Sequence, residues 1–334
     1  MMEAQEDDDD IFVYMGGNQV VPERVRRARI YEGVKIIRAR AFYNRQQLIS
    51  VEFHDEIEII EEHAFSGCVR LRGSIKLLGV KIIKVKAFQN CNRLTDVEFG
   101  DKLETIERIA FYSCYSLRNI TMPSVRNIEM WAFTNCGQLT DLELPEGLET
   151  VEDGAFENCQ RLRRITMPLK ENMVGYAFSH CRNLTSVDLV GGIHKTVASL
   201  HMESWRNELK GEINRINRVL PNTHALSMDA EIQQWLRSVI GQLNHYKAEH
   251  QKILKEATTL LELALWKANL DDNGGEGGVL EREGVRTTRR QLKRARKEIC
   301  VKSGASIVIK NVLPFLTFLE WSKSKRTRQD IFGM

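Results

Sequence analysis

The sequence predicts an α+β fold in which a stacked solenoid of short parallel strands and tight turns is followed by an α-helical region. Three observations predict it. An Ala-Phe phrase followed by Cys and Leu returns every 22 or 23 residues. After each Leu the apolar residues alternate, as in a strand with one buried face. From residue 193 the phrase stops, and apolar residues recur in steps of three and four, as on one face of a helix.

The repeat is complete in six copies. They begin at Ala64, Ala87, Ala110, Ala132, Ala155 and Ala177. An earlier copy begins at Ala41 and has Arg45 in place of the Cys. A fixed period in the twenties indicates a solenoid in which each coil buries its apolar residues against the next.

The spacing within one coil predicts its parts. Leu stands seven residues after the Ala, an aliphatic residue at ten and a large apolar residue at twelve, as in Leu94, Val97 and Phe99. This alternation predicts a short strand, and we expect Ala-Phe on a helical or 3₁₀ turn with the Phe wedged between turn and strand. A second aliphatic residue stands four residues before most of the alanines.

Two stretches depart from the pattern. In the coil that begins at Ala64, Ser74 and Lys76 stand where buried residues are expected, which predicts a β-bulge near Gly73. Residues 11–14 predict an edge strand, followed by a half repeat that covers the exposed end of the stack.

The repeated phrase resembles the BspA-type leucine-rich repeats over residues 25–189. The resemblance implies a curved solenoid with a parallel sheet on its concave side, which binds proteins or surface ligands and does not catalyse a reaction. Two phrases in the tail, TLLELALWKANL and SGASIVIKNVLPFL, resemble the tails of leucine-rich-repeat proteins from algae.

These patterns divide the chain into four parts. We predict an acidic disordered N-terminus over 1–10, an N-terminal cap with a half repeat over 11–40, the solenoid over 41–192 and a helical tail over 193–334. The tail contains a flexible loop over 271–284, which is rich in Gly and Asp.

The tail begins with two predicted helices. One apolar helix face comprises Met202, Trp205, Leu209, Ile213, Ile216 and Leu220, and Pro221 ends it. The second helix is expected to start at Asp229 as its N-cap and to run to about residue 270 with a coiled-coil-like apolar seam. A helix of this length needs a partner helix, either within the chain or on another chain, and in the second case residues 229–270 would mediate self-association.

Composition favours a water-soluble chain: 43% of the residues are hydrophobic, 28% are charged and the net charge is +3. The start lacks the apolar core of a secretory signal, and no apolar run reaches the ~20 residues that span a bilayer. With six of the seven cysteines in the repeat, a cytoplasmic or nuclear location is expected.

The repeated cysteines are expected to be buried free thiols. They occupy one slot per coil, so their Cβ bonds run parallel, which is poor disulfide geometry. No Cys-x-x-Cys pair or other ligand spacing indicates a metal site, and no motif indicates a cofactor.

The polar strand positions are the predicted partner-binding surface. They are Glu52, Asp96, Glu98, Asn119, Thr121, Asp141, Glu143, Arg164, Thr166 and Asp188. Carboxylates two residues apart on a strand lie ~7 Å apart, a separation that inverting glycosidases use. An open, solvated sheet does not raise a carboxyl pKa, so we predict a protein-interaction scaffold and no enzyme, with a carbohydrate-active enzyme as a distant third hypothesis.

A basic segment in the tail is the alternative site. It contains Arg286, Arg289, Arg290, Lys293, Arg294, Arg296 and Lys297. Such a cluster could bind phosphates of nucleic acid or of an anionic membrane, but it lacks the aromatic residues that stack on bases. The leading hypothesis therefore remains an unknown protein partner on the solenoid, with the helical tail as a cap or oligomerisation element.

Overall fold

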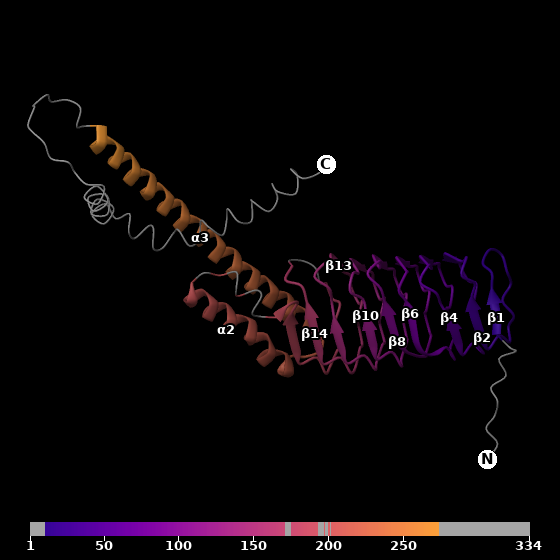
Figure 1. Ribbon diagram of the computed structural model, residues 1–334. Helices are drawn as coiled ribbons and strands as arrows, with labels where there is room; N and C mark the ends of the chain where they lie inside the picture. The colour runs from indigo at the N-terminus through magenta and orange to yellow at the C-terminus, as the bar shows by residue number, and fades with distance from the viewer. Residues whose placement is uncertain (1–10, 171–174, 193–196, 198–199, 201, 274–334) are drawn as a thin grey trace, which may run out of the picture. The chain divides into compact units, whose positions relative to one another are not determined.

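The computed structural model of the chain describes residues 11–170, 175–192, 197, 200 and 202–273 (Figure 1). The chain divides into two compact units, Met1–Leu243 and Asn244–Met334. The first unit holds the β-solenoid together with the helices that follow it directly. The compact unit therefore extends about 50 residues past the end of the repeats, to Leu243.

Each coil of the solenoid has three sides. The first side is formed by one longer strand from each coil. These strands are β1 (Ile11–Tyr14), β2 (Arg27–Ile30), β4 (Ser50–Glu52), β6 (Arg72–Leu77), β8 (Arg93–Phe99), β10 (Asn119–Thr121), β12 (Asp141–Glu143), β14 (Arg164–Met167) and β15 (Ser186–Leu189). All pairs are parallel, and the strands lie in three sheets of order β1-β2-β4, β10-β8-β6 and β12-β14-β15. The register shifts at Gly73, which confirms the predicted bulge.

A second, six-stranded parallel sheet forms the second side. Its strands are β3 (Ile36–Ile37), β5 (Ile59–Ile60), β7 (Ile82–Ile83), β9 (Thr105–Ile106), β11 (Asn127–Ile128) and β13 (Thr150–Val151). The second residue of each is the aliphatic residue four before the alanine, and its side chain is buried. The spacing predicts this buried position but not that it lies in a sheet.

The third side consists of hydrogen-bonded turns, not of the helical or 3₁₀ turn that the sequence predicts. Each of the first six turns contains two left-handed residues, one before the alanine and one three after it, as at Lys86 (φ 56°) and Asn90 (φ 59°), whereas the last turn has only the later one, His180 (φ 63°). Left-handed backbone ends a helical run, and Asn tolerates it better than most residues. This explains why Asn recurs at the later position, a signal that the spacing analysis did not use.

The core is a stack of identical side chains, one from each coil. The Phe rings lie nearly parallel along the whole stack, with centroids 4.8–5.6 Å apart between Phe42 and Phe178. Tyr14 continues the stack at its N-terminal end, with its ring 5.2 Å from that of Phe42. Arg45, in the Cys slot of the first coil, donates from Nε and Nη2 to the carbonyl of Val21 and so ties this end together.

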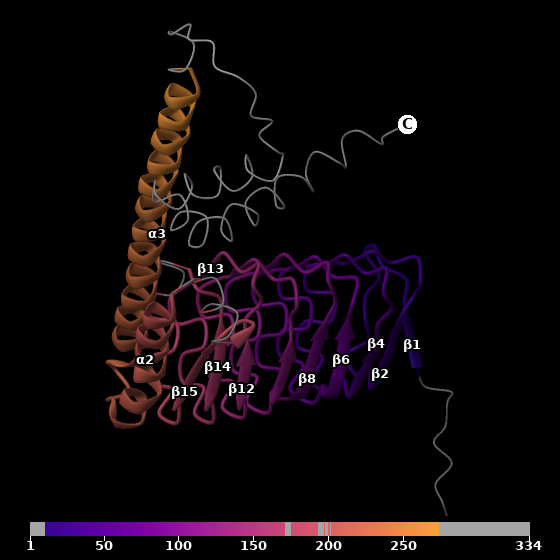
Figure 2. The ribbon, with the colours of Figure 1, turned by 60° about the vertical axis from the view of Figure 1, so that its left-hand side comes forward.

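Helix α2 (Glu203–Val219) and the short 3₁₀ helix η2 (Leu220–Asn222) follow the last coil. Figure 2 shows α2 beside β15, where the amide of Val187 donates to Oδ1 of Asn217 at 2.7 Å. Leu209, Ile213 and Ile216 are buried as predicted. Met202 is 44% exposed, against the prediction, because it lies before the first turn of the helix.

Helix α3 spans Met228–Asn273. Asp229 is therefore not its N-cap, as the sequence predicts, but lies within the first turn. The Asp229 side chain is buried and accepts hydrogen bonds from the amide of Phe178 and the hydroxyl of Ser179, both at 2.7 Å. The last turn of the solenoid accounts for the position of Asp229. The amide of Phe178 in that turn needs a hydrogen-bond acceptor, and the Asp229 side chain provides it.

The apolar seam of α3 changes character along the helix. Ile232 and Val239 are buried in the first unit, whereas Ile253 and Leu260 in the second unit are 45% and 58% exposed. The helix includes Asp271–Asn273, so these three residues do not belong to the predicted loop, and residues 274–284 lie outside the described part.

Candidate functional site

The strands of the first side place the predicted binding residues on one solvated face. All ten are exposed or half-exposed, while the alternate residues of the same strands, such as Val97, Leu142 and Ile165, are buried. The bulge at Gly73 adds Ser74 and Lys76 to this face, opposite Asp96 and Glu98. We call this surface the strand face.

The register places each pair of carboxylates beside hydrogen-bond donors of the next coil. Asn119 lies opposite Asp96, and its Nδ2 donates to Oδ1 of the carboxylate at 2.6 Å. Hydrogen bonds from Thr95 and Asn119, together with the nearby Arg118, hold the pKa of Asp96 below its ordinary value. Asp96 is therefore ionised near neutral pH and is poorly suited to act as a general acid.

Arg164 faces two carboxylates of the preceding coil. It lies opposite Asp141 in the register, and its guanidinium is 3.9 Å from a carboxylate oxygen of both Asp141 and Glu143. These three side chains are more than half exposed, so water weakens the ion pairs. The two carboxylates thus remain accessible to a cation from outside.

Half of the predicted residues line one groove of about 590 Å³. They are Asn119, Thr121, Asp141, Glu143 and Thr166. The groove crosses β10, β12 and β14, where β10 and β12 belong to different sheets. Glu146 also lines it, so three carboxylates and no Lys or Arg face this space. The other five predicted residues, Glu52, Asp96, Glu98, Arg164 and Asp188, lie on the strand face outside the groove.

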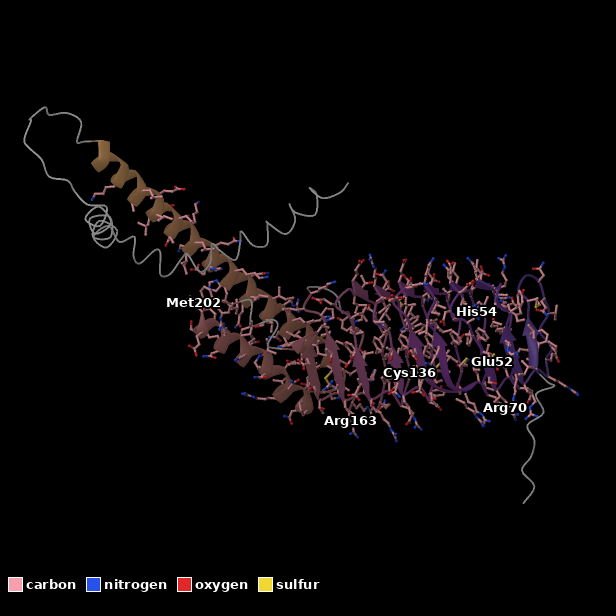
Figure 3. All side chains as sticks on the ribbon, viewed as in Figure 1. Glu52, His54, Arg70, Cys136, Arg163 and Met202 are labelled. Carbon is pink, nitrogen blue, oxygen red and sulfur yellow. The ribbon has the colours of Figure 1, made fainter. Side chains whose placement is uncertain are left out.

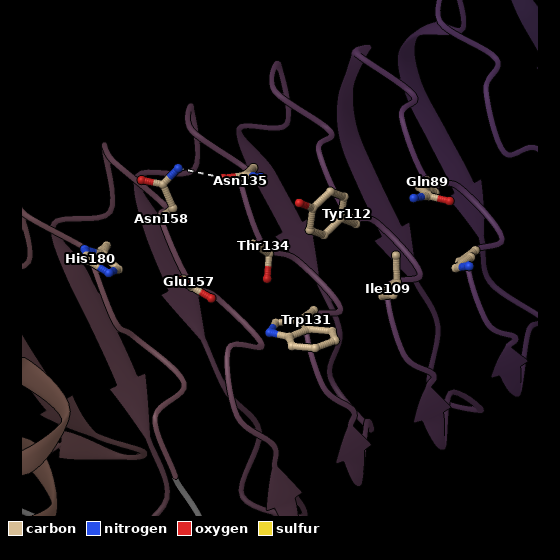
Figure 4. Close-up of a pocket in the computed structure, with 10 residues that line it drawn as sticks. Gln89, Ile109, Tyr112, Trp131, Thr134, Asn135, Glu157, Asn158 and His180 are labelled. Atoms are coloured by element: carbon tan, nitrogen blue, oxygen red, sulfur yellow. Dashed lines mark hydrogen bonds between the residues drawn. The ribbon is translucent and has the colours of Figure 1, made fainter. Parts of the chain in front are cut away.

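A second groove, of about 750 Å³, lies on the turn side (Figure 4). Five successive turns line it, with Trp131 and Tyr112 as its aromatic residues and Asn135 accepting from Asn158 at 2.6 Å. The Trp131 ring covers the next coil so closely that a Cβ at Gly154 would collide with it. Sequence reasoning missed this groove, although Trp131 is the single tryptophan within the repeats.

The repeat pattern identifies the family of the chain. The family model described as BspA type leucine rich repeat region (6 copies) matches residues 24–124 and 81–204, which together cover more than half of the chain. The chain belongs to the BspA-type leucine-rich-repeat family. The resemblance expected from the sequence is therefore confirmed.

Several solved structures are similar to this BspA-type chain. A leucine rich repeat protein of T. pallidum is 26% identical, with 54% of this chain and 75% of that one covered and a TM-score of 0.39. A leucine rich cell surface protein of Faecalibacterium prausnitzii is 23% identical, with 51% and 61% covered and a TM-score of 0.34. A leucine-rich repeat protein of Bacteroides ovatus is 21% identical, with 50% and 61% covered and a TM-score of 0.36. No curated protein has significant similarity to the chain.

The BspA-type cysteines form a ladder of buried thiols. Each Sγ donates to the Phe carbonyl of the preceding coil, for example from Cys68 to Phe42 at 3.1 Å and from Cys114 to Phe88 at 3.3 Å. Burial raises the pKa of the Cys68 and Cys114 thiols to about 12. All six cysteines within the described residues are free, as the sequence predicts.

These thiols should be inert in the native chain. At pH 8 the thiols of Cys68 and Cys114, with a pKa near 12, are ionised to only about one part in 10⁴, and the thiolate is the reactive form. The other four repeat cysteines are equally buried, so a reagent cannot reach them in the folded chain. We expect iodoacetamide to leave the six repeat cysteines unlabelled in the native chain and to label all of them in denaturant, as measured by peptide-resolved mass spectrometry. Labelling of any repeat cysteine at equal rates in both states would contradict this expectation.

The described part of the chain shows no arrangement of three or more His, Cys, Asp or Glu residues that could hold a metal ion. None of the described helices has both the length and the apolar character needed to span a lipid bilayer. The predicted phosphate-binding segment, residues 286–297, lies outside the described residues.

Proposed function

We propose that the chain is a non-enzymatic protein-interaction module whose strand-face groove binds a basic segment of a protein partner. The observation that carries the proposal is the lining of this groove, which has three carboxylates, no Lys or Arg, and the hydroxyls of Thr121 and Thr166. Leucine-rich-repeat solenoids typically bind proteins or mediate adhesion, which supports this class of function.

The geometry favours a Lys or Arg side chain as the recognised group. The side chains of Asp141 and Glu143 are 63% and 79% exposed, and their contacts with Arg164 are long. A cation from a partner can therefore approach both carboxylates, and partial desolvation in the groove strengthens the attraction. The neighbouring threonine hydroxyls can hydrogen bond to the backbone of a peptide.

Peptide selection tests the proposal without knowledge of the natural partner. A random peptide library selected on the full chain should be enriched in sequences with Lys or Arg, and a selected peptide should then be titrated by fluorescence anisotropy. The double variant Asp141→Asn, Glu143→Gln should weaken its binding by about tenfold or more, because two close charge contacts are lost.

The matched control is the variant Glu104→Gln, Glu149→Gln. It removes the same charge from exposed residues next to β9 and β13 on the second side of the solenoid. It should leave the affinity unchanged. Enrichment of neutral or acidic peptides, or equal loss of affinity in both double variants, would contradict the proposal.

Self-association through residues 229–270 stays a prediction, and we propose that residues 244–270 of this range mediate it. Part of the seam before Leu243 is already buried within the first unit, whereas Ile253 and Leu260 are exposed. A cytoplasmic or nuclear location likewise stays a prediction from the sequence.

A further inference from the structure

The edge where the turns lead into the longer strands carries a row of arginines. At this edge the half repeat and each later coil have a buried aliphatic residue, which is Val25 in the half repeat and Leu in the later coils. Directly before it stand Arg24, Arg70, Arg93 and Arg161 in four coils. Directly after it stand Arg26, Arg72, Arg118 and Arg163. We call these eight side chains the arginine ridge.

Backbone hydrogen bonds show that the ridge positions stack from coil to coil. The amide of Ile49 donates to the carbonyl of Arg26, and the amide of Arg72 donates to the carbonyl of Ile49. The same bond joins Thr185 to Arg163. Figure 3 shows Arg70 and Arg163 on the same edge of the solenoid. The ridge positions of successive coils therefore form a row along the solenoid axis.

The residues at the two ridge positions of each coil are either positively charged or uncharged. In the eight coils the two positions hold eight arginines, seven hydroxyl or amide residues and Ile49, with no lysine and no carboxylate. All eight arginines are exposed. None of them forms an ion pair with a carboxylate of the described residues, and Arg70 donates to the neutral Oε1 of Gln47.

The second side of the same solenoid is built differently. Its corresponding row alternates in sign from coil to coil, and these charges pair with one another: Lys81 lies 2.7 Å from Glu58, and Arg126 lies 3.6 Å from Glu149. Stacked coils can thus neutralise their own cations. Among the described residues no guanidinium of the ridge has a carboxylate oxygen within the 4.0 Å of an ion pair, although Arg118 lies near Asp96.

The spacing of the ridge suits a long, regular polyanion. Adjacent parallel strands lie about 4.8 Å apart, so arginines on alternate coils recur every ~10 Å. Arg26, Arg72, Arg118 and Arg163 follow this rule, since 46, 46 and 45 residues separate them. The four span roughly 30 Å, about the length of one turn of a B-form duplex.

We propose that the arginine ridge binds the phosphate backbone of a nucleic-acid duplex without reading its bases. Arginine forms planar, paired hydrogen bonds with phosphate, which accounts for its use to the exclusion of lysine. The interleaved Gln, Asn, Ser and Thr are the neutral residue types that contact phosphates and sugars in such complexes.

Two other anionic partners fit the edge less well. Single-stranded nucleic acid is held by aromatic residues that stack on its bases, and Tyr115 is the one exposed aromatic side chain next to the ridge positions. A membrane surface is bound by basic residues together with an apolar face that inserts. The two positions that flank the buried aliphatic residue hold sixteen residues in the eight coils, and only Ile49 among them is aliphatic.

Fluorescence anisotropy with a labelled 20-base-pair duplex and the full chain tests the proposal. We expect a Kd on the order of 10⁻⁶ to 10⁻⁴ M that weakens steeply with salt. The triple variant Arg72→Gln, Arg118→Gln, Arg163→Gln should bind about tenfold more weakly or worse at 0.1 M salt. Its plot of log K against log salt should be shallower by about 2 to 3.

The matched control is Lys35→Gln, Lys81→Gln, Arg126→Gln, which removes the same charge from the second side. It should bind like the native chain, and circular dichroism should show that both variants are folded. Equal weakening by both triple variants would overturn the proposal, and so would unchanged binding by the ridge variant, because the duplex would then contact another part of the chain. Tighter binding to heparin, to phosphatidylserine vesicles or to the single strand would also overturn it.

Discussion

Replacing Phe111 by alanine should lower the free energy of unfolding by about 3–5 kcal/mol, the largest stability effect that we expect from a single substitution in the solenoid. The Phe111 ring is fully buried between two nearly parallel neighbours, at 5.0 Å from Phe88 and 5.1 Å from Phe133. It also meets Phe99 edge to face at 6.1 Å. The variant leaves a cavity in the middle of the stack, where both neighbouring coils lose contacts.

Chemical denaturation of the native chain and the variant measures the loss. Tyr115→Ala provides the control, since Tyr115 lies in the same coil and is 52% exposed. The control should cost less than about 1 kcal/mol. A similar loss in both variants would show that the stacked rings do not carry the stability that we assign to them.

Replacing Asp229 by alanine should lower the free energy of unfolding by about 1–3 kcal/mol, because it leaves the buried amide of Phe178 without its acceptor. In every earlier turn this amide donates to the alanine carbonyl of the next coil, as Phe156 does to Ala177. No coil follows the last one, and the Asp229 carboxylate takes the place of that carbonyl. Helix α3 thus terminates the turn ladder of the solenoid.

The conservative variant Asp229→Asn separates this hydrogen-bonding role from the charge. Burial, reinforced by the nearby Asp153 and Glu157, raises the pKa of Asp229 against the opposing hydrogen bonds from Phe178 and Ser179. A raised pKa in the folded chain means that ionisation disfavours the folded state. The contribution of this group is therefore most favourable below the unfolded pKa of ~3.9 and falls as pH rises through the folded value.

Two comparisons by chemical denaturation follow from this. At neutral pH Asp229→Asn should be more stable than Asp229→Ala, because its amide oxygen still accepts from Phe178. Between about pH 4 and pH 7 the native chain should lose stability relative to Asp229→Asn. An unchanged difference between these two chains across this range would show that the carboxylate does not titrate with a raised pKa.

The strand face shows which features of a binding surface the residue spacing predicts and which it does not. The alternation after each leucine predicts which side chains are solvated, and all ten predicted residues are exposed or half-exposed. It does not predict that Thr121, Asp141 and Thr166 line one groove while Asp96 and Glu98 lie outside it. That grouping depends on where the strand pairing is interrupted, which differs between coils of nearly identical sequence pattern.

The sequence by itself determined the length of each coil, the buried Ala, Phe, Cys and Leu positions and the solvated strand residues. These are local properties, because a coil that repeats every 22 or 23 residues must bury the same slots each time. Only the tertiary structure decided the role of Asp229, the second sheet and the two grooves. Each of these depends on contacts between separate coils or between a helix and the last coil, as between Asp229 and Phe178, 51 residues apart, and no short-range spacing encodes such contacts.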